Sequence, residues 1–259
     1  MNIVVCVKQV PDTAVERTLR PEDSTLDRAS VDGVINEIDE YAIEEGLLLA
    51  EAHGGEVTIL SMGPEKASES IRKALSMGAD KAIHLVDDAL AGSDALSTSL
   101  ALATVLQRTG FDLVIVGSES TDARMGVLAP MLAERLGCPQ LTLASKVEID
   151  GTSISIRRQT DYGYDTVQGS LPAVVSVVEK INEPRYPSFK GIMAAKKKPV
   201  EVLSVADAGI DPSQVGLGAA ATEVVSFTKR PPRQAGTIVK DEGDGGVKAA
   251  EFLAAQKFI

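Results

Sequence analysis

The sequence predicts an α/β protein with a doubly wound, mostly parallel sheet, followed by an added β segment and a C-terminal arm. Short apolar runs alternate with helical patterns through residue 137, which is the order that a helix-covered parallel sheet requires. The runs are rich in Val, Ile and Leu, as expected when both faces of a sheet are buried. Hydrophobic residues make up 44% of the chain and aromatic residues only 3%, so aliphatic side chains must build the core.

The chain opens with a short apolar strand, NIVVCV at 2–7. A turn-rich loop with two prolines, Pro11 and Pro21, then runs to Asp32. An amphipathic helix is predicted over 35–55, because its apolar residues recur at helical spacing and a glycine pair ends it.

Two further strands with their helices and a fourth strand follow in the same order. Pro64 suits the first position of its helix, and Gly78 lies near the end of that helix. Ser93 or Asp94 is expected to cap the next helix. The predicted elements are a strand at 56–63, a helix at 64–80, a strand at 81–88, a helix at 93–110, a strand at 111–117 and, after a loop at 118–126, a helix at 127–137.

The pattern changes after Pro139. Residues 141–178 have the pattern of successive short strands, with Asp150-Gly151 as a hairpin turn. These strands are expected to extend the sheet in antiparallel fashion at one edge.

Beyond Lys198 the chain becomes rich in Gly, Pro and acidic residues, up to a final short helix at 246–259. A tail of this length with little core pattern usually has a partner or is disordered. We therefore predict one nucleotide-binding α/β domain over 1–198 and an arm over 199–259.

Composition and charge exclude several classes of function. No apolar run approaches the ~18 residues of a membrane span, and the N-terminus has a strand pattern without an export leader. The net charge is -11 and no extended basic face is present, which argues against nucleic acid as a partner. Two cysteines and two histidines supply neither a disulfide framework nor a metal-ligand pair. A reduced, cytoplasmic setting is expected.

Ligands of an open parallel sheet bind beyond the carboxyl ends of its strands, where the strand order reverses. Within the loop at 117–126, Gly117 lets the backbone approach a ligand, and Arg124 can add a charge. The helix after this loop presents unpaired N–H groups suited to a phosphate. The chain contains neither GxGxxG nor a P-loop, and no Ser-His-Asp or Cys-His grouping is evident. These features predict a nucleotide-binding platform without obvious bond-breaking groups.

The stretch NEPRYPSFKGIMAAKKK at 182–198 is unusual in so acidic a chain. Ser188 can cap a short helix on which Phe189, Ile192 and Met193 share one face. One interpretation is a core helix with lysines at its C-terminal end, where they favour the helix dipole. The other is an exposed docking element, and the residues alone leave both open.

Several of these segments resemble the small (β) subunit of an electron transfer flavoprotein, and the resemblance covers essentially the whole chain. The segments are VVCVKQVPD, NEIDEYAIEE, GPEKASESIRKALSMGADKAIHL, DLVIVGSESTD and, most specifically, NEPRYPSFKGIMAAKKK. Their details are similar to the actinobacterial-like branch.

The resemblance implies a Rossmann-like fold and an electron-carrier subunit without catalysis of its own. Such proteins are heterodimers, in which the large (α) subunit carries the redox FAD and the small subunit binds AMP and supports the FAD domain. Electrons arrive from acyl-CoA dehydrogenases or similar flavoenzymes, as in fatty acid β-oxidation, and leave to a quinone-linked oxidoreductase. The arm at 199–259 is then expected to wrap the large subunit.

The resemblance also implies site residues. The adenine of AMP is expected to face Cys6, Asn36, Glu37, Ile38, Asp39 and Met62. The phosphate is expected to meet the loop formed by Gly117, Asp122, Ala123, Arg124, Met125, Gly126, Val127 and Leu128. The stretch at 182–198 is expected to dock a dehydrogenase through Phe189, Ile192 and Met193, with Lys196, Lys197 and Lys198 steering an acidic partner surface.

Two departures from the family pattern bear on the ligands. Where many members carry a hydroxyl- or amide-bearing run, this chain has Arg124-Met125-Gly126-Val127-Leu128-Ala129, which reduces the side-chain donors to a phosphate. Gln159 stands where members often carry a Glu near the flavin, so one negative charge is lost there. Two alternatives remain: a bifurcating carrier with a second FAD in this subunit, and a stand-alone adenine-nucleotide-dependent enzyme, against which the missing P-loop and catalytic groups argue.

Overall fold

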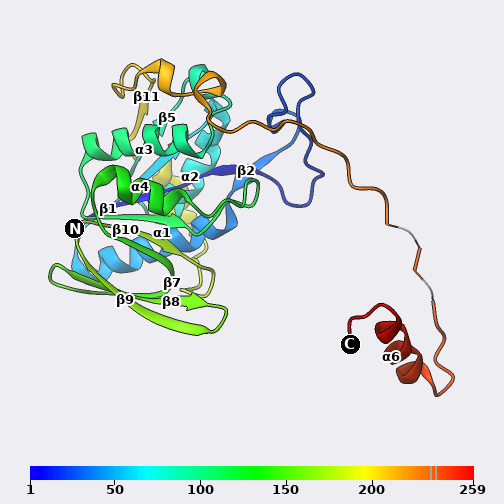
Figure 1. Cartoon of the computed structure of the whole chain (residues 1–259). Helices are drawn as coiled ribbons and strands as arrows, with labels where there is room; N and C mark the ends of the chain where they lie inside the picture. The colour runs from blue at the N-terminus through cyan, green and yellow to red at the C-terminus, as the bar shows by residue number, and fades with distance from the viewer. Residues whose placement is uncertain (234, 237) are drawn as a thin grey trace. The chain divides into compact units, whose positions relative to one another are not determined.

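A computed structural model of the chain describes residues 1–233, 235–236 and 238–259 (Figure 1). It divides into two compact units, Met1–Val224 and Val225–Ile259.

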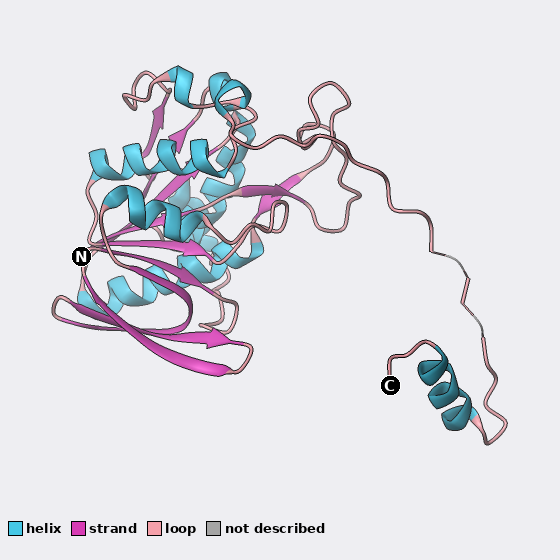
Figure 2. Ribbon diagram, viewed as in Figure 1, coloured by secondary structure: helices cyan, strands magenta, loops and turns pink. Residues whose placement is uncertain are grey.

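The first unit is built on a nine-stranded sheet, in the order β11-β5-β4-β1-β6-β10-β7-β8-β9 (Figure 2). Neighbouring strands are parallel from β11 to β7, and β8 is antiparallel to both of its neighbours, β7 and β9. The strands are β1 (Asn2–Cys6), β4 (Glu56–Met62), β5 (Lys81–Leu85), β6 (Leu113–Gly117), β7 (Gln140–Asp150), β8 (Ser153–Thr160), β9 (Gly163–Ser170), β10 (Ala173–Val177) and β11 (Val200–Leu203).

Helices cover both faces of this sheet, as the sequence predicted. Successive residues of a strand point to opposite faces, and β1 shows the consequence for the core. Ile3 and Val5 join the buried cluster that includes Ile43 of α1. Val4 lies in the other cluster, with residues of α3 and α4. The helices of this unit are α1 (Glu37–His53), α2 (Ser68–Met77), α3 (Ala95–Thr109), α4 (Leu128–Leu136) and α5 (Phe189–Ala195).

Several local signals at helix ends and turns were predicted correctly, but Pro64 precedes a short 3₁₀ helix (Glu65–Ala67), and α2 begins only at Ser68. Asp94 rather than Ser93 caps α3, because its Oδ1 accepts a hydrogen bond of 3.0 Å from the Ser97 N–H. The turn between β7 and β8 falls at Asp150-Gly151, where Gly151 has a φ of +58°. This left-handed conformation is accessible to glycine at little steric cost.

The β segment after Pro139 is more deeply integrated than an edge extension. Only β8 and β9 extend the sheet in antiparallel fashion, whereas β10 lies between β6 and β7 and is parallel to both. All five residues of β10 are buried. A strand covered on both faces does not alternate between polar and apolar residues. The sequence AVVSV therefore suits a strand in the interior of the sheet.

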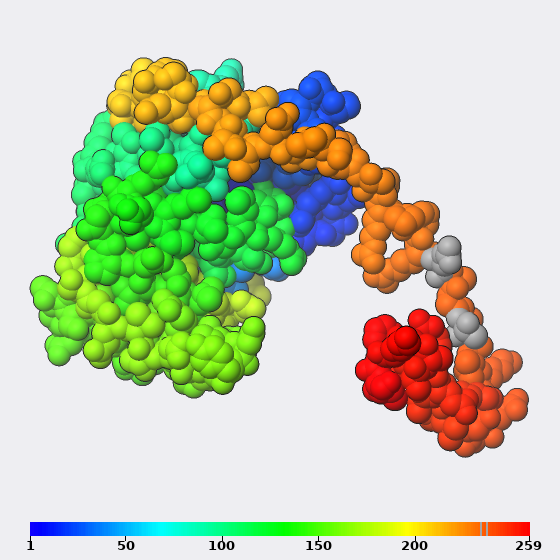
Figure 3. Space-filling view, viewed as in Figure 1, coloured from blue at the N-terminus to red at the C-terminus, as the bar shows by residue number. Residues whose placement is uncertain are grey.

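The first unit also extends beyond the boundary predicted at residue 198. The strand β11 pairs in parallel with β5, and Leu203, Val205 and Ile210 after it are buried in the core. This gold segment lies against the surface of the first unit in Figure 3. The sequence did not reveal this segment, because its strand has only four residues and turns follow it. Its apolar residues therefore show neither helical nor strand periodicity over enough positions to be recognised. Residues 199–224 therefore belong to the α/β unit.

The second unit contains the predicted C-terminal helix, α6 (Gly245–Ala255). None of the residues of α6 is buried. Phe252, Phe258 and Ile259 expose 58%, 73% and 77% of their surface. Across the described residues of both units, no helix has the length and apolar character needed to cross a membrane.

Candidate functional site

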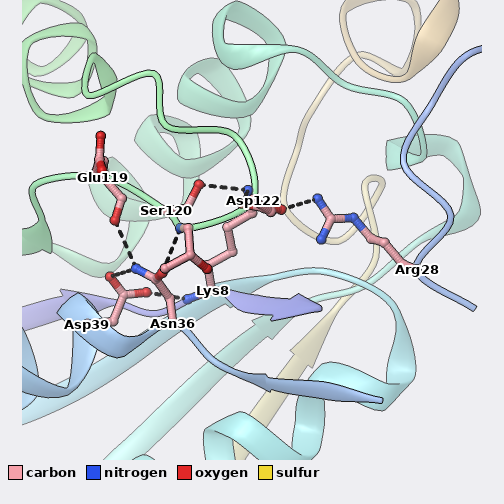
Figure 4. A network of polar contacts seen from close by, with 8 residues as sticks. Lys8, Arg28, Asn36, Asp39, Glu119, Ser120 and Asp122 are labelled. Atoms are coloured by element: carbon pink, nitrogen blue, oxygen red, sulfur yellow. Dashed lines mark hydrogen bonds and ion pairs between the residues drawn. The ribbon is translucent and has the colours of Figure 1, made fainter. Parts of the chain in front are cut away.

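The strand order reverses between β1 and β6. The chain moves from β1 to β4 and β5 on one side, and then returns to place β6 on the other side of β1. The chain after β1 continues into β2 (Gln9–Pro11), which pairs with β3 (Gly33–Ile35) immediately before α1. Segments distant in sequence thus meet at the carboxyl ends of β1 and β6, and Figure 4 shows the polar side chains that they bring together.

Asp39, in the first turn of α1, lies at the centre of this polar cluster. Its Oδ2 accepts a hydrogen bond of 2.8 Å from the Lys8 N–H, and its Oδ1 accepts one of 3.0 Å from Asn36 Nδ2. Burial raises the pKa of Asp39 to about 7, although these donors, the Lys8 charge and the backbone of Gly117 act in the opposite direction. A Cβ at Gly117 would lie 2.4 Å from Asp39 Oδ1, so a glycine is required here by the carboxylate itself.

Asn36 joins the start of α1 to the loop after β6. Its Nδ2 donates to the Glu119 carbonyl at 3.0 Å, and its Oδ1 accepts from the Thr121 N–H at 3.0 Å. The buried Asn36 side chain therefore holds the loop 118–122 in place through the loop's backbone.

Asp122 binds two cations from distant parts of the chain. Lys8 Nζ contacts its Oδ1 at 2.8 Å, and Arg28 Nη2 contacts its Oδ2 at 2.5 Å (Figure 4). The Asp122 side chain is fully buried. Burial alone raises the pKa of Asp122, but Lys8 and Arg28 together hold it well below its ordinary value. Lys8 and Arg28 thus share the Asp122 carboxylate, and the buried Asp39 carboxyl lies beside Lys8 in the same cluster.

The sequence-predicted residues around this cluster differ in exposure. Asn36, Asp39 and Cys6 are buried and Met62 is half-buried, whereas Glu37 is exposed. Burial raises the pKa of the Cys6 thiol to about 12, with Asp39 adding to the effect. Cys6 is therefore an inert packing group and not a reactive thiol.

The distal part of the predicted phosphate loop lies outside the cluster. Ala123, Arg124, Met125 and Gly126 are exposed, and Val127 and Leu128 are half-buried. Among the described residues, the Arg124 side chain has no hydrogen-bond or ion-pair partner, while its N–H donates to the Ser120 carbonyl at 2.8 Å. The cations that the fold brings to this corner are Lys8 and Arg28, which sequence reasoning missed. Lys8 directly follows the first strand, which was a usable signal, but nothing local marks Arg28.

The residues present fit an anion such as a phosphate. No side chain caps α4, whose first-turn N–H groups thus lack the usual internal acceptors. In the loop before α4, Thr121 Oγ1 is a buried atom that has no hydrogen-bond partner within the described part of the chain. Arg28 uses only one of its nitrogens in a described contact. Unpaired donors beside two cationic side chains are the properties that a phosphate site requires. The described residues contain no cluster of His, Cys, Asp and Glu suited to a metal ion.

Neutralising Asp122 is expected to destabilise the fold in a pH-dependent way. Asp122→Asn should lower the free energy of unfolding at pH 7 by about 1–2 kcal/mol, because the carboxylate is buried while both cations remain partly exposed. A pKa below the ordinary 3.8 means that this stability is fully present above that pH and is lost as the pH falls below it. Urea unfolding from pH 8 to 3 should show a constant difference that shrinks below about pH 4.

The exposed turn residue Asp161 offers a matched control for this experiment. Asp161→Asn should change the free energy of unfolding little at any pH, because it loses no buried contact. A difference between Asp122→Asn and the natural protein that grows as the pH falls would contradict the role assigned to Lys8 and Arg28.

The stretch at 182–198 forms the predicted short helix, α5. Ser188 caps it, because its Oγ accepts a hydrogen bond of 3.0 Å from the Gly191 N–H. Phe189 exposes 82% of its surface, Ile192 46% and Met193 50%. The core-helix interpretation is therefore wrong, since it requires these three side chains to be buried.

The lysines at the end of this stretch have different roles. Lys196 and Lys197 are exposed and have no ion-pair partner among the described residues. Lys198 Nζ instead donates to the carbonyls of Leu75, Gly78 and Ala79, at 2.9, 3.1 and 2.6 Å. The end of α2 therefore binds the ammonium group of Lys198, and the steering role of this lysine stays a prediction.

Gln159 lies near the end of β8. Its Oε1 is a buried atom, and none of the described residues forms a hydrogen bond with it. On the neighbouring strand the ring of Tyr164 lies under the Arg157 guanidinium, 3.7 Å from the ring centroid. A buried acceptor without a hydrogen-bond donor lowers the stability of a folded protein. This position therefore suits one where a ligand or a partner chain supplies the donor.

Comparison with known proteins agrees with this architecture. Residues 23–208 match the family model described as "Electron transfer flavoprotein domain". The chain is 53% identical over 264 residues to "Electron transfer flavoprotein subunit beta" of Mycobacterium tuberculosis, covering 100% of this chain and 99% of the relative. The protein of the same name in Mycobacterium leprae is 52% identical with the same coverage. The one in Thermoanaerobacterium thermosaccharolyticum is 39% identical over 239 residues, or 92% of each chain. This chain belongs to the electron transfer flavoprotein family, as a beta subunit of the actinobacterial-like branch.

Proposed function

We propose that this chain is the small subunit of a cytoplasmic heterodimer that carries electrons and catalyses no reaction by itself. The observation that carries this proposal is the full-length similarity to beta subunits. An electron transfer flavoprotein alpha subunit is the partner, and the FAD that accepts and donates electrons lies mainly in that large subunit. The donors are acyl-CoA dehydrogenases or similar flavoenzymes, and the acceptor is a quinone-linked oxidoreductase.

The nucleotide proposed for the carboxyl ends of β1 and β6 is AMP, held as a structural ligand. Its adenine faces the segment around Asn36 and Asp39, next to Cys6 and Met62. Its phosphate binds the first-turn N–H groups of α4, with the loop from Gly117 to Leu128 around it. Thr121 Oγ1 supports this placement, because it is buried and has no hydrogen-bond partner among the residues that the structure describes.

The loop 117–128 has few side-chain donors for a phosphate. We propose that Lys8 and Arg28 supply the positive charge in their place. Each cation shares Asp122 with the other and keeps N–H groups that the described contacts do not use. Asp122 itself repels a phosphate, so its proposed role is to hold the two cations in place. This assignment differs from one in which Asp122 binds the nucleotide directly.

The nucleotide content of the purified heterodimer tests this proposal. Denaturing the heterodimer should release about one AMP and about one FAD per dimer, quantified by chromatography, because one flavin and one nucleotide site are proposed. Arg28→Gln should lower the retained AMP by roughly tenfold, the effect of about 1.4 kcal/mol, through loss of a charged contact. Arg124→Gln is the matched control, since the Arg124 side chain contacts no group of the cluster.

Other results of this measurement would overturn the assignment. Two flavins per dimer without AMP would favour a bifurcating carrier with a second FAD in this subunit. Turnover of an adenine nucleotide by the isolated chain would favour a stand-alone enzyme. Equal AMP retention in Arg28→Gln and the natural protein would remove Arg28 from the phosphate site.

The exposed face of α5 is proposed as the surface that docks the electron-donating dehydrogenase. Phe189 is the apolar anchor, and Ile192 and Met193 flank it. An exposed aromatic side chain next to two further apolar residues is the composition of an interface centre. Lys196 and Lys197 accelerate association with an acidic partner, and Lys190 on the same helix adds to this charge.

A further inference from the structure

The two ends of the stretch 182–198 are bound tightly to the first unit, although its middle is exposed. At the N-terminal end, Arg185 forms a two-pronged ion pair with Glu44 of α1. Its Nε and Nη2 contact the two carboxylate oxygens at 2.8 and 2.9 Å, and its backbone N–H donates to the same carboxylate at 3.0 Å. The Glu44 side chain is only 6% exposed. Such bidentate pairs fix orientation as well as distance.

Three further contacts join this end to α1. Glu51 lies 2.6 Å from Arg185 Nη1, and the hydrogen bonds to Glu44 and Glu51 raise the pKa of Arg185 above its ordinary value. Asn182 Nδ2 donates to the Tyr41 carbonyl and to the Glu45 carboxylate, both at 3.1 Å. The chain that leads into α5 is therefore held along one side of α1.

The other end is bound to α2. The ammonium group of Lys198 donates to three carbonyls at the C-terminal end of α2, where the helix leaves its last acceptors unpaired. Between the two ends, Gly191 of α5 lies against α2 so closely that a Cβ would be 2.5 Å from the Ser76 carbonyl oxygen. A backbone atom cannot move aside as a flexible side chain can, so any larger residue must displace α5.

We propose that Arg185, Gly191 and Lys198 are positioning residues, which hold α5 in the orientation that presents Phe189 to the partner flavoenzyme. This inference rests on the docking function proposed above. A short helix of seven residues is unstable by itself. A loop held in its bound conformation loses less freedom on binding, and affinity increases accordingly. Arg185, Gly191 and Lys198 thus control the affinity of the exposed face of α5 for the dehydrogenase.

The test is a kinetic comparison in the intact heterodimer. Gly191→Ala and Arg185→Lys are assayed with the dehydrogenase as the varied component, because Lys cannot form the two-pronged contact with Glu44. We expect the half-saturating dehydrogenase concentration to rise roughly tenfold while the maximal rate is retained, the pattern of lost binding. Reduction of the bound flavin by dithionite should be unchanged. Glu134→Gln, at an exposed residue of α4 outside the stretch 182–198, serves as a control that alters a charge without altering the anchors.

A double-mutant cycle separates positioning from general destabilisation. If Gly191→Ala acts by misplacing Phe189, adding it to Phe189→Ala should raise the half-saturating concentration by less than about twofold further, because both changes remove one interaction. Fully multiplicative effects, or normal half-saturation in both Gly191→Ala and Arg185→Lys, would overturn the positioning roles. Normal half-saturation in Phe189→Ala alone would instead refute the docking function on which they rest. Should Gly191→Ala fail to fold, Arg185→Lys and its combination with Phe189→Ala complete the cycle.

Discussion

Phe189→Ala is expected to slow electron transfer from the dehydrogenase at least about 30-fold at low dehydrogenase concentration. Truncating a buried aromatic anchor typically costs about 2 kcal/mol or more of binding, and each 1.4 kcal/mol corresponds to about tenfold in affinity. Phe189 is 82% exposed in the free chain, so its removal leaves no cavity in the core. The melting temperature and the flavin content of the heterodimer should therefore stay unchanged while the dehydrogenase-linked turnover falls.

Tyr162 provides a matched control, because it is an aromatic residue with the same exposed fraction of 82%, in the turn between β8 and β9. Tyr162→Ala should leave both melting and dehydrogenase-linked turnover close to those of the natural protein. The docking role of Phe189 would be refuted by a lower melting temperature of Phe189→Ala together with normal turnover per folded molecule. That pattern is the one expected of a core side chain.

Truncation after Val224 is expected to abolish a stable heterodimer while leaving the first unit folded. The second unit exposes large apolar side chains, including Val225 at 89% and Ile238 at 92%. Exposed apolar surface of this kind marks an interaction site, and we propose that the large subunit covers it. Co-purification with the large subunit should fall more than about tenfold, and bound FAD should fall with it. The melting temperature of the truncated chain by itself should match that of the full chain.

Hydrogen exchange checks the same proposal without altering the sequence. Amides of α6 should exchange rapidly in the isolated chain and slowly in the heterodimer, because helical hydrogen bonds without tertiary contacts open readily. Amides of β1 and β6 should be protected in both samples, since these strands are buried. Equal protection of α6 with and without the large subunit would contradict the proposed partner role of the second unit.

Much of the fold could be predicted from local sequence patterns. The alternation of strands and helices, the Asp94 and Ser188 caps and the turn at Asp150-Gly151 each depend on residues within a few positions of one another. A cap is a hydrogen bond to an N–H group two or three residues away. The apolar composition of a strand such as β1 already indicates that the strand is buried. These features were therefore available before any tertiary contact was known.

The position of the polar cluster at the ends of β1 and β6 could be predicted from the sequence, but the residues that form it could not. Strand ends and a glycine-containing loop indicated where the site lies, and the sequence suggested Arg124 as its cation. The contacts found are instead Lys8 with Asp122, 114 positions apart, and Arg28 with Asp122, 94 positions apart. No periodicity connects such residues. They meet because β1 and β6 are neighbours in the sheet, which is a property of the topology.

The sequence by itself determined the fold class, the order of the elements and the composition of the stretch 182–198. Only the tertiary structure decided that Phe189 is exposed, that Lys198 is bound to the end of α2 and that the first unit continues through Val224. The physical reason is the range of the interactions. Helical spacing and capping act between near neighbours, and so they can be recognised in the chain. An apolar stripe or a lysine looks the same in the sequence whether it is buried or exposed. Its neighbours in the tertiary structure determine whether it is buried.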